Sequence, residues 1–115
     1  MTTRARFEQL AADALDDLPE WVRTRMDNVE IMIEERPPDD QPSLLGLYEG
    51  IPLTRRGNGY FGVMPDRITL FRSTIEASAR GNEERLQRIV AHTVAHEVAH
   101  LFGISDDRLR EIDRY

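Results

Sequence analysis

The sequence predicts an α+β fold, in which a short mixed sheet packs against a long helix near the C-terminus and a second helix at the N-terminus. Apolar residues recur at helical spacing towards both ends of the chain, whereas the middle has the alternation and turn residues of strands. A helix followed by strands and then by helices is typical of α+β proteins. With 115 residues the chain has the size of one domain, and we expect residues 1–115 to form a single one.

The first helix is predicted to begin after Thr2 or Thr3, either of which can cap it, and to end near Leu18-Pro19. Its apolar residues have the spacing of an amphipathic packing helix. They are Phe7, Leu10, Ala11, Ala14 and Leu15. A second short helical piece is expected over residues 19–26, and its Trp21, the only tryptophan, is interpreted as a core residue.

The middle of the chain is predicted to form strands and loops. In VEIMIE (29–34) a branched apolar residue occupies every second position, which is the period of a half-buried strand. RPPDDQPS (36–43) excludes regular structure, and is interpreted as a solvated loop or as a flap over a site. LLGLY and YFGV, between residues 44 and 63, are expected to be irregular strands, and RITLF (67–71) to be the last strand, with Ile68 and Leu70 on one face.

Composition excludes several classes of function. The formal net charge is −6 and the arginines form no block that would follow a phosphate backbone, so we expect no nucleic-acid partner. The absence of cysteine excludes disulfides and thiolate metal sites. The N-terminus lacks the apolar segment of a signal peptide, and no stretch approaches the roughly 20 apolar residues that span a bilayer. We therefore expect a cytoplasmic protein with no membrane partner, and we expect it to be a monomer.

A long helix is predicted from about residue 83 to 102, with Asn82 at its start and acidic residues in its first turn, where the helix dipole favours them. All three histidines, His92, His96 and His100, lie on it. Positions four apart differ by only about 40° around a helix, so the histidines form one stripe. The valines of this helix lie on roughly the opposite side, which argues against a core role for the histidines.

The segment HEVAH (96–100) is H-E-x-x-H on a helix, a pattern typical of a metal site. Two imidazoles one turn apart can bind one zinc ion at about 2.0–2.1 Å. Glu97 lies between them and is placed to hold a water without occupying a coordination position. The pattern therefore predicts His96 and His100 as Zn²⁺ ligands.

The residues after the motif suggest a third ligand. Gly103 follows His100 by three positions, where a residue that tolerates positive φ can end the helix and turn the chain back. Such a turn can bring Asp106 to the same metal, and three protein ligands with one open position are the arrangement of a catalytic zinc. Asp107 is the adjacent alternative as ligand. Asp106 could instead cap a final helix, a role that Ser105 could equally fill.

His92 lies one turn before His96, roughly 6 Å further along the helix axis. This is too far to join the other two imidazoles easily at one small ion. We expect a surface role for His92, or one that supports the ligands.

The segment HEVAHLFGISD resembles the zincin metallopeptidases, in the metzincin-like form H-E-x-x-H-x-x-G-x-x-H with aspartate in the last position. The strand ITLFR before the motif helix adds a similarity to the small bacterial proteins known as minimal zincin-like metallopeptidases. The resemblance implies a zinc-dependent peptidase with His96, His100 and Asp106 as ligands and Glu97 as general base. It also implies a peptide or protein substrate, bound at an exposed strand edge that LLGLY or YFGV could supply.

The sequence departs from larger metzincins in lacking a methionine after Asp106, where those enzymes have a methionine-containing turn. Met64 could lie beneath the site instead, although core packing is the simpler interpretation. Tyr48, Tyr60 and Tyr115 are candidates to donate a hydrogen bond to a developing oxyanion, and each could equally be a packing residue.

Two functions are therefore considered. The first is a zinc peptidase, of low activity because an aspartate ligand leaves zinc a weaker Lewis acid than a third histidine would. The second is a metal-binding regulatory or peptide-binding module without useful peptidase activity. Glu97, which a purely structural metal site does not need, favours the peptidase.

Overall fold

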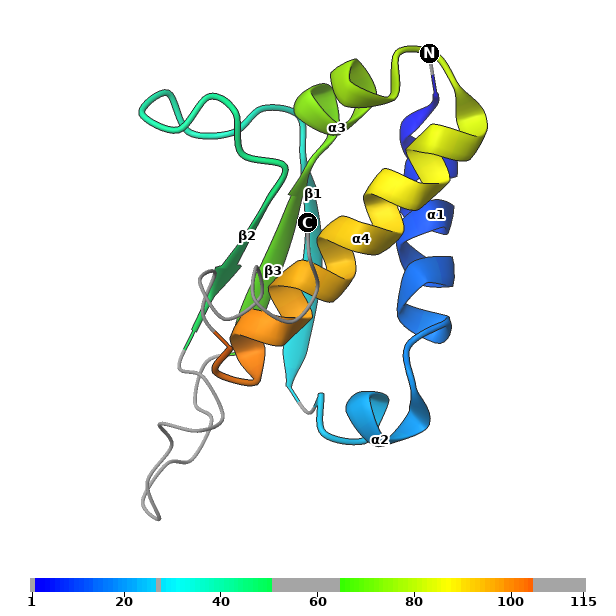
Figure 1. Cartoon of the computed structure of the whole chain (residues 1–115). Helices are drawn as coiled ribbons and strands as arrows, with labels where there is room; N and C mark the ends of the chain where they lie inside the picture. Colours follow the sequence, from blue (N-terminus) through cyan, green and yellow to red (C-terminus); the bar gives the residue numbers. More distant parts are fainter. Residues whose placement is uncertain (1, 27, 51–64, 105–115) are drawn as a thin grey trace.

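The computed structural model describes residues 2–26, 28–50 and 65–104 and confirms the α+β fold. The elements, in order, are α1 (Arg4–Asp16), α2 (Glu20–Arg23), β1 (Val29–Glu34), β2 (Gly46–Glu49), β3 (Asp66–Phe71), α3 (Arg72–Ala79) and α4 (Glu83–Leu101). The strands form one mixed sheet in the order β1-β3-β2, with β1 parallel and β2 antiparallel to β3. Helix α4 crosses one face of the sheet, and α1 packs alongside α4 (Figure 1).

Helix α1 forms where its apolar spacing predicts it. The hydroxyl of Thr3 accepts a hydrogen bond from the backbone N–H of Arg6 at 3.1 Å, a cap that contributes about 1 kcal/mol to helix stability. Phe7, Leu10, Ala11 and Ala14 are buried in the core. These four residues are spaced three or four apart, so they lie on one face of α1, and this face is the one that packs into the core, as the sequence pattern predicts.

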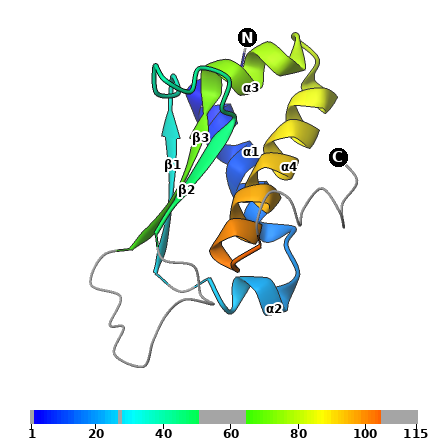
Figure 2. The same ribbon diagram turned by 60° about the vertical axis from the view of Figure 1, so that its left-hand side comes forward.

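The interpretation of Trp21 as a core residue is wrong, because its side chain is 59% exposed. Helix α2 is only four residues long, shorter than expected, and it buries Val22 instead. Neighbouring positions on a helix point about 100° apart, and in α2 the core-facing position belongs to Val22 rather than to Trp21. Trp21 packs edge-on against Phe102, with 5.8 Å between ring centroids. This contact joins α2 to the end of α4, and Figure 2 shows that the two helices lie near each other there.

The predicted strands at 29–34 and 67–71 are confirmed, and LLGLY contributes β2. Ile68 and Leu70 are fully buried on the face of β3 that joins the core. Residues 36–43 form neither helix nor strand, as expected. The strand expected at YFGV lies outside the described residues.

Helix α3 follows β3 directly and was not predicted. It buries only Ile75 and Ala79, so the sequence carries little helical periodicity there. The turn into α4 needs two residues with positive φ, Arg80 at 52° and Gly81 at 76°.

No described helix is long and apolar enough to cross a membrane.

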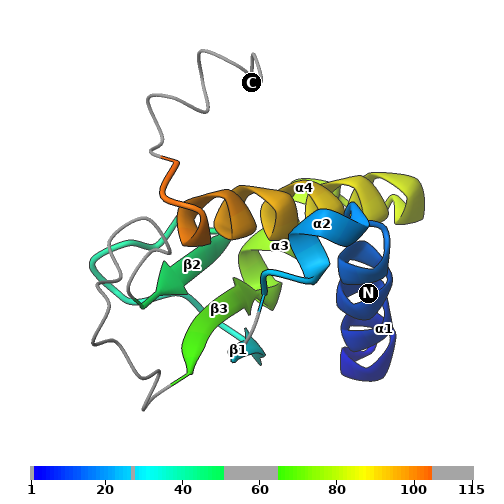
Figure 3. The same ribbon diagram turned by 90° about the horizontal axis from the view of Figure 1, so that it is seen from below.

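Helix α4 begins and ends as predicted, and Figure 3 shows its C-terminal half beside the strands. The Asn82 side chain accepts a hydrogen bond from the N–H of Arg85 at 2.9 Å. At the other end Gly103 has φ 84°, its N–H donates to the His100 carbonyl, and the N–H of Ile104 donates to the Ala99 carbonyl. This pair of bonds is a Schellman ending, which turns the chain back immediately after the motif.

Candidate metal centre

The imidazoles of His96 and His100 lie next to each other on α4, one helical turn apart. Their ring centroids are 4.9 Å apart and the rings are tilted by 68°. Both residues are half-buried. The helix alone sets this arrangement, because residues at i and i+4 lie on the same side.

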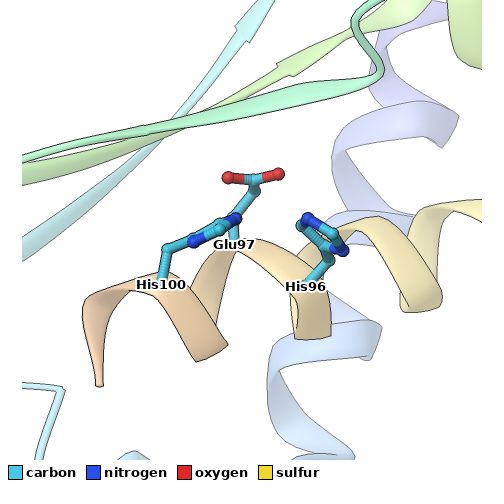
Figure 4. Close-up of side chains that lie close together, drawn as sticks. All are labelled: His96, Glu97 and His100. Carbon is cyan, nitrogen blue, oxygen red and sulfur yellow. The ribbon is translucent and has the colours of Figure 1, made fainter. Parts of the chain in front are cut away.

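Glu97 is 7% exposed and belongs to the buried side of α4. One potential ligand atom from each of His96, Glu97 and His100 lies within 4.8 Å of the others. Figure 4 shows the three side chains leaving the helix on the side that faces the strands, with the carboxylate between the helix and the sheet. A carboxylate and two imidazoles therefore converge at the edge of the helix and sheet layers.

The donor set fits a zinc ion. Imidazole nitrogens and carboxylate oxygens are ordinary zinc ligands. Their ligand atoms lie within 4.8 Å of one another, and two ligands of one zinc ion are at most about 4 Å apart, so side-chain rotation would bring them to the ion. The same proximity also permits a second role for Glu97, beside the metal rather than on it. Retention or loss of the metal in a Glu97 variant distinguishes these two roles.

Asp106, the predicted third ligand, lies outside the described residues. So do Asp107, the alternative ligand, and Ser105, the alternative helix cap, as well as Met64, Tyr60 and Tyr115. The predicted turn at Gly103 does lie within the described residues. The Schellman ending there confirms that the chain turns back after the helix.

His92 is exposed, and its ring centroid lies 6.4 Å from that of His96. It is not a member of the metal-binding group formed by the described residues. We expect His92→Ala to retain the zinc stoichiometry of the wild type, because the two imidazoles that converge are those of His96 and His100. Elemental analysis of the purified variant measures this, and loss of the metal would make His92 a ligand.

Tyr48 of β2 donates a hydrogen bond from its hydroxyl to Asp66 Oδ2 at 3.0 Å. Asp66 is 3% exposed at the start of β3, and the sequence analysis did not single it out. A Cβ on Gly50 would lie 2.5 Å from Asp66 Oδ1, and Gly50 has φ 155°, so glycine is needed beside this pair. The proximity of this tyrosine and carboxylate depends on strand register, which the sequence does not display.

Comparisons with known proteins bear on the family and the fold of this chain. Residues 26–115 match the profile of a family described as zincin-like metallopeptidases. A solved structure of a conserved hypothetical protein from T. thermophilus is similar, with a TM-score of 0.59 and 22% identity over 85% of this chain and 92% of that chain. At this identity the likeness shows the fold alone. No curated protein matches the chain.

Proposed function

Because the chain belongs to the zincin-like metallopeptidase family, we propose that it is a zinc-dependent peptidase that hydrolyses peptide bonds with Glu97 as general base. The observation that carries the proposal is the convergence of two imidazoles and one carboxylate within 4.8 Å on α4. A structural metal site needs the imidazoles but not a buried carboxylate held between them and the sheet. We expect the activity to be low.

In this proposal His96 and His100 hold the metal, and Asp106 is the third ligand. A bound zinc ion would lower the pKa of a coordinated water and polarise the scissile carbonyl. Both histidines are half-buried rather than buried, which supports a centre that a substrate can reach.

Glu97 moves the proton in this mechanism. Its carboxylate accepts a proton from the attacking water and delivers it to the nitrogen of the leaving amine. The Glu97 side chain is only 7% exposed and lies beside the imidazoles. A positioned base of this kind contributes roughly 10²–10⁴-fold to the rate.

The substrate proposed is an extended peptide or an unfolded protein segment. The described sheet has the strand order β1-β3-β2, so β2 is an edge strand of that sheet. It lies against α4, close to Glu97. An extended chain that adds to this edge through backbone hydrogen bonds would pass beside the metal centre.

A second function is a module that binds a metal and a peptide without cleaving it. The small size of the described fold favours this alternative, since a three-stranded sheet and one layer of helices offer a shallow binding surface. The presence of Glu97 beside the imidazoles favours the peptidase.

The test combines metal analysis with cleavage of a broad library of extended peptides. We expect about one equivalent of zinc, cleavage that stops on chelation and returns with zinc, and a melting temperature that chelation lowers, because the metal binds only the folded chain. Bound zinc without any cleavage would favour the binding module. Protein without zinc affinity would contradict both functions.

A further inference from the structure

Gly46, the first residue of β2, is buried where this strand meets α4. A Cβ at this position would lie 2.7 Å from Thr93 Cγ2, 3.2 Å from Glu97 Cγ and 3.2 Å from the backbone oxygen of Thr69. Its backbone φ is not in the left-handed region, so glycine is required here for space rather than for conformation. From the sequence alone, Gly46 is only one residue of the irregular strand expected at LLGLY.

Two of the three neighbours have little freedom to move. Thr93 is 4% exposed, and its hydroxyl donates a hydrogen bond to the Ile89 carbonyl at 2.7 Å, which fixes the rotamer that directs Cγ2 to β2. The oxygen of Thr69 belongs to the backbone of β3, which pairs with β2. An added methyl group therefore meets a fixed methyl on one side and a fixed carbonyl on the other.

Glu97 is the neighbour that can move. Its Cγ belongs to a flexible side chain, and rotation about its bonds relieves a contact of 3.2 Å. The same rotation moves the carboxylate, which now lies within 4.8 Å of the imidazole ligand atoms. The backbone of β2 at Gly46 thus forms the wall against which the Glu97 side chain rests.

We infer that Gly46 is a positioning residue for Glu97. The missing side chain lets β2 approach α4 closely, and the close approach holds the Glu97 carboxylate beside the metal centre. A strand with any side chain at this position would push either Glu97 or the whole strand away. The inference rests on the proposed role of Glu97 as general base, but the position of the Glu97 side chain can be measured without any activity.

The first arm of the test compares Gly46→Ala with Gly81→Ala. Gly81 has φ 76° and nothing within 4 Å of an added Cβ, so its alanine variant loses stability through backbone strain alone, before the start of α4. We expect Gly46→Ala to lower kcat by roughly 10–100-fold, as a displacement of about 1 Å in a catalytic group does, with KM and zinc affinity within about twofold of the wild type. Gly81→Ala should lower the melting temperature without changing kcat, KM or zinc affinity.

The second arm measures where Glu97 lies, whether or not the protein cleaves peptides. In protein loaded with Co²⁺, the paramagnetic shift of the Glu97 side-chain carbons depends on their distance from the metal, and Glu97→Gln identifies these signals. We expect the shift to change in Gly46→Ala and to stay as in the wild type in Gly81→Ala. An unchanged shift in Gly46→Ala would overturn the inference, even if the peptidase proposal stands. A changed shift supports it even if no peptide is cleaved.

The double variant Gly46→Ala/Thr93→Ser separates stability from positioning. Serine keeps the hydroxyl that bonds the Ile89 carbonyl and removes the methyl group that would lie 2.7 Å from the new side chain. We expect the melting temperature to recover towards that of Thr93→Ser alone, while kcat and the Glu97 shift stay altered, because the contact with Glu97 Cγ remains. Full recovery of kcat and of the shift together with stability would overturn the inference, since the single variant would then have acted through destabilisation.

Discussion

Replacing Glu97 by glutamine should lower the cleavage of extended peptides by roughly 10²-fold or more, while the protein keeps about one equivalent of zinc. Glutamine preserves the size of the buried side chain and removes its basic carboxylate. If Glu97 accepts the proton of the attacking water, its loss affects the chemical step. It should not affect retention of a metal held by His96, His100 and Asp106.

The matched control is Glu84→Gln, the same chemical change in the exposed first turn of the same helix. It removes only a favourable interaction with the helix dipole, about 0.3–1 kcal/mol, and should leave cleavage unchanged. Metal content, melting temperature and kcat are measured for both variants beside the wild type.

Any other result for Glu97→Gln would lead to a different conclusion about the site. Loss of zinc together with activity would make Glu97 a ligand, which the 4.8 Å spread of the donor atoms permits. Equal cleavage by variant and wild type would assign the hydrolysis to a contaminant or to another mechanism. Zinc in both proteins with cleavage by neither would favour the binding module.

The parts of this fold that follow from local sequence were predictable. Caps at Thr3 and Asn82, the alternation in β1 and the turn at Gly103 depend on residues close in the chain. The proximity of His96 and His100 also depends on one helix alone, so the motif predicts it without knowledge of the sheet. Hence the centre of the candidate site could be read from five consecutive residues.

The parts that depend on packing were missed. Trp21 is exposed and its neighbour Val22 is buried, a difference that composition does not reveal. Helix α3 has too few buried residues for a periodic signal. Gly46 and Glu97 are 51 residues apart in the chain, and β2 approaches α4 so closely that a Cβ on Gly46 would lie 3.2 Å from Glu97 Cγ. Such proximity follows from the register and approach of β2.

Replacing His96 or His100 by alanine should reduce zinc affinity by more than the 10–100-fold typical of residues that only support a ligand, because each variant removes an atom that binds the metal. The chain should remain folded. Both histidines are half-buried, the core-facing Val94 and Val98 of α4 are unchanged, and alanine is the best helix former.

The melting temperature then reports the loss of the metal separately from any damage to the fold. At a zinc concentration 100 times the dissociation constant, binding stabilises the wild type by about 2.7 kcal/mol, which for a chain of this size raises the melting temperature by roughly 10 °C. His100→Ala and His96→Ala should melt near the chelated wild type and respond little to added zinc. His92→Ala is the matched control, since it removes an imidazole from the same helix and should keep the full zinc response. If both ligand variants bind zinc and melt like the wild type, the metal lies elsewhere in the chain and the mechanism built on Glu97 fails with it.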